Sequence, residues 1–259
     1  MVDEVLFETK GKVAVITINR PEKRNAITPG MQGLLRSAFK EFRDNDELRV
    51  AVLTGSGDKA FTAGADLKDI EGRDLDIRRM RFYHSNPEDR YVSVYKPVVA
   101  AVNGFCYGDG LNLLCAMTDI RVASDTATFS YAEVRFGFSG NGGALQWLPR
   151  QVPYAKAMEW LLMGKTFAAD EALQAGLVNE VVPLEKVKER ALEIAEQLAL
   201  LPPLTLRSVK EAVVRGLAMS VPDAIQFSFA LESLLYTTED AVEGPKAFAE
   251  KRDPVFKGR

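Results

Sequence analysis

Two glycine-rich segments carry residue types that could hold a reacting anion. They run from residue 59 to 68 and from residue 102 to 112, and each follows a run of apolar residues typical of a buried strand. Small residues at a strand exit let the backbone approach a ligand closely, and a helix that begins there presents N–H groups without partners in the helix. Such groups can stabilise an anionic oxygen. Each segment taken alone also fits an ordinary strand-to-helix turn.

Familiar motifs of nucleotide binding fail in this chain. Residues 163–166 read Met-Gly-Lys-Thr, the end of a phosphate-binding loop, but Glu159 stands where the upstream glycine belongs. Gly108 and Gly110 begin a dinucleotide fingerprint whose third glycine is replaced by Leu113. We therefore expect neither a nucleotide phosphate loop nor a dinucleotide site.

The few histidine and cysteine residues exclude further classes. The chain has one histidine, His84, in a polar stretch, and two cysteines, Cys106 and Cys115, in an apolar one. A single histidine argues against a Ser-His-Asp triad, and these numbers exclude a disulfide framework or a Cys-rich zinc site. We expect no metal, and we place His84 at the surface or at an entrance.

Composition indicates an ordinary globular protein. Of 259 residues, 47% are hydrophobic, and 33 basic against 36 acidic side chains give a net charge of −3. This balance argues against a nucleic-acid binder. Apolar runs stay shorter than the ~18 residues of a membrane span, and the first residues lack a secretory pattern. We expect a soluble cytoplasmic enzyme without a membrane partner.

The first two-thirds of the chain must supply the elements that position the glycine-rich segments. Residues 5–9 and 12–18 predict a hairpin, and Thr28 predicts the N-cap of a helix whose apolar stripe recurs at helical spacing. The stripe consists of Met31, Leu34, Leu35, Ala38, Phe39 and Phe42. Buried-type strands are predicted at 50–54, 97–102 and 119–123. Strands alternating with helices favour an α/β core.

Beyond residue 183 the pattern becomes helical, with predicted helices at 184–201, 204–217, 223–236 and 240–251. We therefore divide the chain into an α/β core, residues 1–200, and a helical C-terminal region, residues 201–259.

In their order and spacing, the motifs of this chain resemble those of the crotonase superfamily, also called the enoyl-CoA hydratase/isomerase family. The resemblance covers more than 200 positions. Its main carriers are Asn19-Arg20-Pro21 with Asn25-Ala26, Phe61 to Asp66, Val102-Asn103-Gly104, Thr118 to Arg121, Ala132-Glu133, Gly142-Gly143, Ala172 to Val178 and Phe248 to Arg252.

The resemblance implies a spiral of repeated ββα units, with C-terminal helices that mediate formation of a homotrimer or a dimer of trimers. It implies acyl-CoA substrates, with coenzyme A as part of the thioester and no permanently bound cofactor. The oxyanion-hole amides fall on Ala65 and Asp109. The residues implied at the coenzyme A moiety are Lys59, Ala63, Asp66, Leu67, Lys68, Phe248 and Lys251.

The catalytic acids of the family are only partly retained. Two glutamates hold a water in the hydratases; the first falls on Asn112 and the second on Glu133, while a third acidic position falls on Asn141. An amide can orient a water or substrate but cannot serve as acid or base. Asp109 stands where glycine is usual, and we expect its carboxylate to turn away while its N–H points inward.

With one well-placed carboxylate, the sequence slightly favours double-bond isomerisation of an enoyl-CoA over hydration. Hydrolysis or C–C cleavage of a CoA ester is an alternative, because it also needs only an enolate. The loss of one glutamate and the unusual Asp109 leave a third reading, a catalytically silent acyl-CoA-binding scaffold.

Overall fold

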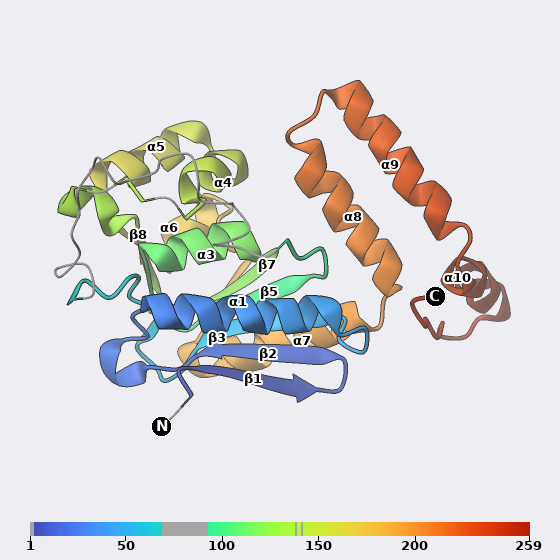
Figure 1. The fold of residues 1–259 in the computed structure, drawn as a ribbon, viewed down its shortest axis with the longest axis horizontal. Helices are drawn as coiled ribbons and strands as arrows, with labels where there is room; N and C mark the ends of the chain where they lie inside the picture. The colour runs from blue at the N-terminus through green and yellow to red at the C-terminus, as the bar shows by residue number, and fades with distance from the viewer. Residues whose placement is uncertain (1–2, 69–92, 138, 141) are drawn as a thin grey trace.

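Two β-sheets and the helices around them form the body of the protein (Figure 1). The computed structural model describes residues 3–68, 93–137, 139–140 and 142–259. In spatial order, the larger sheet contains β1 (Val5–Lys10), β2 (Val13–Ile18), β3 (Val50–Gly55), β5 (Val98–Val102), β7 (Ile120–Ser124) and β10 (Glu180–Val182). The smaller sheet contains β4 (Ala60–Thr62), β6 (Phe105–Tyr107), β8 (Thr128–Ser130) and β9 (Thr166–Ala168).

The chain passes repeatedly from the larger sheet to the smaller one. Strands β3, β5 and β7 are parallel neighbours in the first sheet, and β4, β6 and β8, which follow them in sequence, are parallel neighbours in the second. With α3 (Asp109–Met117), strands β5 and β6 complete a ββα unit. Successive strand exits therefore lie beside one another, and the predicted α/β core is confirmed.

The N-terminal hairpin and the first helix form as predicted. Strands β1 and β2 pair antiparallel around Gly11, whose φ of +56° suits glycine. Helix α1 (Pro29–Asp44) begins where Thr28 Oγ1 accepts a hydrogen bond from Met31 N at 3.2 Å. The predicted apolar stripe is buried except at Leu34, which is 46% exposed.

The remaining helices of the body enclose the sheets. Helix α7 (Val187–Ala199) packs Ala191 and Ala195 on the valine-rich face of the larger sheet. The others are α4 (Ala144–Gln151), α5 (Tyr154–Met163) and α6 (Ala169–Gln174), with short 3₁₀ helices η1 (Pro21–Lys23), η3 (Ala132–Phe136) and η4 (Leu184–Lys186). Within the described residues, no helix is long and apolar enough to cross a membrane.

Three C-terminal helices extend away from this body (Figure 1). They are α8 (Pro203–Gly216), α9 (Val221–Leu235) and α10 (Glu239–Glu250). Large apolar side chains on them are exposed, among them Val209, Val213, Ile225, Phe229, Leu234 and Phe248. The boundary near residue 200 stays a prediction, but a change of packing occurs there, since α7 lies on the sheet and α8 leaves it.

A buried lysine holds the end of α1 against the segment that enters β5. Lys96 is 2% exposed, and its Nζ donates to the carbonyl oxygens of Phe42 at 2.9 Å and Asn45 at 2.7 Å. Burial lowers the pKa of Lys96 to about 8, because the charged form loses its hydration.

This shift predicts a pH dependence of stability. The unfolded chain binds the Lys96 proton more tightly than the folded chain does, so the free energy of unfolding should rise between pH 8 and about 10.5. The rise due to Lys96 should reach about 2–3 kcal/mol. Urea unfolding of the wild type and of Lys96→Met at pH 7.5, 9 and 10.5 measures it as a difference. Parallel pH curves for the two proteins would contradict the assignment.

Candidate active site

The two glycine-rich segments meet at Gly64 and the start of α3. A Cβ built on Gly64 would lie 2.7 Å from the carbonyl oxygen of Tyr107 and 3.3 Å from the amide nitrogen of Asp109. Gly64 also has a φ of +92°, which side chains rarely adopt. Only glycine allows this approach, and it brings residues 64–65 beside the first turn of α3.

The backbone amides on either side of Ala65 have hydrogen-bond partners within the protein. The amides of Ala63, Gly64 and Asp66 each donate to an oxygen inside the protein. Among the described residues, no hydrogen bond uses the amide of Ala65. Asp109 is the first residue of α3, where N–H groups point out of the helix end. The structure thus brings together two amides that the sequence assigned to an oxyanion hole.

Asn25 supports the segment that carries Ala65. Its side chain is fully buried, its φ is +56°, and its Nδ2 donates to the carbonyl oxygens of Ser56 at 2.9 Å and Ala60 at 2.8 Å. Thr62 Oγ1 donates to the Asn25 carbonyl oxygen at 2.6 Å and accepts from Gly64 N at 3.0 Å. Residues 62–64 are thereby fixed to the loop before α1.

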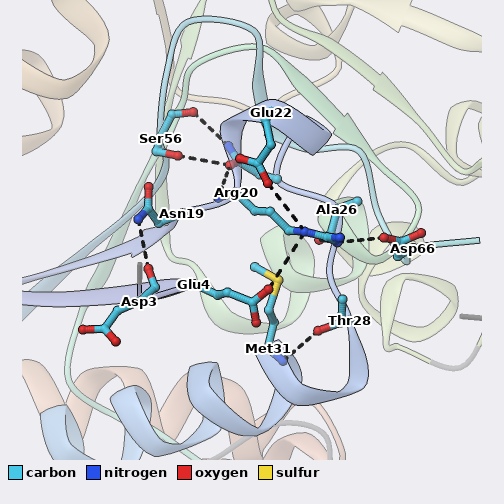
Figure 2. Close-up of polar contacts among 11 residues, drawn as sticks. Asp3, Glu4, Asn19, Arg20, Glu22, Ala26, Thr28, Met31, Ser56 and Asp66 are labelled. Carbon is cyan, nitrogen blue, oxygen red and sulfur yellow. Dashed lines mark hydrogen bonds and ion pairs between the residues drawn. The ribbon is translucent and has the colours of Figure 1, made fainter. Parts of the chain in front are cut away.

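An ion pair ties the same loop to the far end of the segment. Figure 2 shows the Arg20 side chain reaching Ala26 and Asp66; Arg20 Nη1 lies 2.7 Å from Asp66 Oδ2 and 3.3 Å from the Ala26 carbonyl oxygen. The hydrogen bond from Arg20 lowers the pKa of Asp66. The contact of Asp66 with coenzyme A stays a prediction; in this structure its carboxylate accepts from Arg20.

A chain of four polar side chains lies beside the paired amides. Gln32 Nε2 donates to Asp109 Oδ2 at 3.2 Å, and Asn112 Nδ2 donates to Asp109 Oδ1 at 3.3 Å and to Glu133 Oε1 at 3.2 Å. Asn112 is fully buried, and the other three are partly buried. Helices α1 and α3 and the 3₁₀ helix η3 therefore each contribute to one cluster.

Glycines make room for this cluster. A Cβ on Gly108 would lie 3.5 Å from the carboxylate atoms of Glu133, and a Cβ on Gly142 would lie 2.4 Å from Asn112 Cγ. Asn112 Oδ1 accepts from Ala144 N at 3.0 Å. A backbone N–H can only donate, so this bond fixes the carboxamide with its NH₂ group toward the two carboxylates.

One expectation about the cluster needs correction. The Asp109 carboxylate was expected to turn away, whereas it accepts from the same nitrogen that donates to Glu133. Two amide donors, Gln32 and Asn112, hold it in place. The sequence analysis did not identify Gln32 as a site residue. Nothing in its position near the start of α1 indicates a contact with Asp109, which lies 77 residues later.

The residues predicted at coenzyme A fall into two groups. Lys59, Ala63, Leu67 and Lys68 share the segment of Ala65, and both lysines are exposed. Phe248, 87% exposed, and Lys251 belong to α10 and its end, which Figure 1 places at the opposite side of the molecule from the segment following β3. This chain alone does not bring the two groups together.

Two other residues singled out in the sequence, His84 and Asn141, lie outside the described residues. In the part of the chain that the structure describes, no group of three or more His, Cys, Asp or Glu side chains could hold a metal ion. The thiols of Cys106 and Cys115 are buried, and burial raises their pKa values, so neither is poised as a nucleophile.

Comparison with known proteins gives consistent matches. The family model described as enoyl-CoA hydratase/isomerase matches residues 8–259. The chain is 37% identical to (E)-benzylidenesuccinyl-CoA hydratase of Thauera aromatica, over 98% of this chain and 99% of that one. It is 39% identical to carnitinyl-CoA dehydratase of Citrobacter koseri, over the full length of both.

Solved structures of enoyl-CoA hydratases have a similar fold. An enoyl-CoA hydratase from Bacillus anthracis superposes with a TM-score of 0.92 at 31% identity, covering 99% of this chain and 100% of that one. An enoyl-CoA hydratase subunit from Geobacillus kaustophilus gives a TM-score of 0.91 at 37% identity, covering 99% and 98%. The crotonase-like fold implied by the sequence motifs is confirmed.

The role of Asn25 predicts a large loss of stability on truncation. Asn25→Ala leaves the buried carbonyl oxygen of Ala60 and the partly buried one of Ser56 without their donor. It also places alanine at a positive φ, which strains the backbone. The free energy of unfolding should therefore fall by about 2–4 kcal/mol. Asn25→Gly relieves the backbone strain and should recover part of that loss. Denaturant unfolding measures both, with the exposed Gln174→Ala as control. A change below about 0.5 kcal/mol, as expected for a surface site, would contradict the role.

Proposed function

Because this chain belongs to the enoyl-CoA hydratase/isomerase family, we propose that its site binds an enoyl-CoA thioester and holds the enolate oxygen at the amides of Ala65 and Asp109. The observation that carries the proposal is the approach of Gly64 to the Asp109 amide, beside a cluster that contains Glu133. This chemistry needs two parts. One is the pair of backbone amides of Ala65 and Asp109, which we call the amide clamp, and the other is an adjacent carboxylate.

The clamp acts on charge that develops during the reaction. Removing or adding a proton next to a thioester carbonyl places negative charge on its oxygen, and preorganised N–H donors stabilise that charge without reorganising. One such donor contributes about 3–4 kcal/mol in well-studied oxyanion holes. Asn25, Thr62 and Arg20 hold one side of the clamp in position before substrate arrives.

Glu133 is the proposed proton carrier. Its carboxylate packs against Gly108, one residue before the Asp109 amide, so it faces carbon atoms next to an oxygen held there. Asn112 orients Glu133 but cannot titrate. Isomerisation and hydration pass through the same enolate, and the names of the relatives, a hydratase and a dehydratase, favour addition or removal of water.

The coenzyme A moiety is proposed to bind along residues 59–68. Lys59 and Lys68 are exposed cations suited to its phosphates, Ala63, Asp66 and Leu67 line the adenine end, and the thioester serves as substrate without a resident cofactor. Phe248 and Lys251 belong to α10 and its end, which lies on the other side of the molecule in Figure 1, so we propose that a neighbouring copy supplies them. A cytoplasmic location remains a prediction of the sequence.

The proton-carrier role predicts a severe defect in Glu133→Gln, which keeps the size of the side chain but removes its acid. Turnover of 2-trans- or 3-enoyl-CoA should fall by about 100- to 10,000-fold. Chromatography of the acyl-CoA products measures it, with the exposed Glu196→Gln as control. Full turnover by Glu133→Gln would refute the role, and CoA-ester binding by the wild type without any turnover would indicate a silent scaffold.

The family resemblance implies a homotrimer or a dimer of trimers, and we propose that the exposed C-terminal helices form its interface. Phe229 and Ile225 on α9 are 62% and 51% exposed, and burying such a surface stabilises an assembly. Light scattering of the wild type should give a multiple of three chain masses, and Phe229→Asp with Ile225→Asp should lower it. A wild-type monomer at micromolar concentration would contradict the proposal.

A further inference from the structure

We propose that Asp109 supplies a second carboxylate for proton transfer, working with Glu133 across Asn112, so that the site can hydrate an enoyl-CoA. This inference rests on the proposed function and deepens it. The sequence leaves one acid at the positions implied by the resemblance, but the structure adds another from a position where none was expected.

The pairing of Asp109 with Glu133 is inferred from their hydrogen bonds to Asn112. One nitrogen, Asn112 Nδ2, lies 3.3 Å from Asp109 Oδ1 and 3.2 Å from Glu133 Oε1. A carboxamide has two N–H hydrogens, one for each carboxylate, and the bond from Ala144 N fixes the NH₂ group toward them. A neutral amide thus links the two carboxylates through a single nitrogen.

The position of Asp109 places its carboxylate close to the reaction. The main-chain amide of the same residue is one of the two proposed donors to the thioester oxygen, so its side chain starts beside the reacting carbons. Gln32 Nε2 holds the other carboxylate oxygen at 3.2 Å. In the cluster of Gln32, Asp109, Asn112 and Glu133, the two carboxylates can carry a proton and the two amides cannot.

The proposed step balances as an addition of water. Water oxygen bonds to the β-carbon while one water proton passes to the Asp109 carboxylate, and the electrons of the double bond move to the thioester oxygen as an enolate. Protonated Glu133 then delivers its proton to the α-carbon, and the enolate returns to a carbonyl. Transfer from Asp109 back to Glu133 through the next bound water restores the starting state.

Electrostatics favours an Asp109 carboxylate that takes up a proton during the reaction over one that stays charged. A carboxylate that stays charged beside the enolate raises the energy of that enolate. A carboxylate that takes up the water proton loses its charge as the enolate charge develops. An aspartate next to the oxyanion amides is therefore compatible with hydration and opposes isomerisation carried out by Glu133 alone.

The test separates the side chain of Asp109 from its amide. Asp109→Asn and Asp109→Gly both keep the main-chain N–H and remove the carboxylate. Two rates are measured: hydration of crotonyl-CoA or cinnamoyl-CoA, and exchange of the α-hydrogen of butyryl-CoA in deuterated water, which needs only Glu133 and the amide clamp. Asp170→Asn, on an exposed part of α6, serves as the matched control.

In both Asp109 variants the ratio of the hydration rate to the exchange rate should fall at least about 100-fold below its wild-type value, because hydration loses its second carboxylate while exchange loses only a charge that opposes the enolate. The inference is overturned if the Asp109 variants hydrate at the wild-type rate, or if both rates fall equally in both variants. It is also overturned if the wild type isomerises 3-enoyl-CoA without hydrating any 2-enoyl-CoA. The proposed function fails separately, if the wild type neither turns over nor exchanges an acyl-CoA.

Discussion

The site depends on how closely two strand exits approach each other. Gly64 has no room for a Cβ beside Tyr107 and Asp109, and at the base of the same exits a Cβ on Gly104 would lie 2.2 Å from the carbonyl oxygen of Lys59. Asn103 locks that base, because its Nδ2 donates to the carbonyl oxygens of Gly55 and Gly57. Parallel pairing of β3 with β5 and of β4 with β6 sets the two exits side by side, and glycine lets them touch.

Amide side chains organise the charged groups of the site. Asn25 shapes the segment that carries Ala65, while Asn112 and Gln32 hold the carboxylates. An amide donates and accepts without changing its charge with pH, so it can fix a carboxylate in place while leaving proton transfer to that carboxylate. This explains how a chain with Asn at position 112 still has an ordered acid cluster.

The sequence predicted the elements whose patterns are long. The hairpin, the stripe of α1, the three buried strands and the C-terminal helices all formed near their expected bounds. The three-residue strands β4, β6 and β8 were not predicted, since three residues are too few for a periodic pattern. The contact of Gln32 with Asp109 and the separation of α10 from residues 59–68 arise only from tertiary packing, and no local pattern encodes them.

The amide clamp can be observed directly by isotope-edited infrared spectroscopy of an acyl-CoA whose thioester carbonyl carries carbon-13, recorded free in water and bound to the protein. Two N–H donors that polarise the carbonyl should shift its stretching band to lower frequency in the bound state, by more than water does. A band that stays at or above its frequency in water would show that the oxygen does not lie between the amides of Ala65 and Asp109.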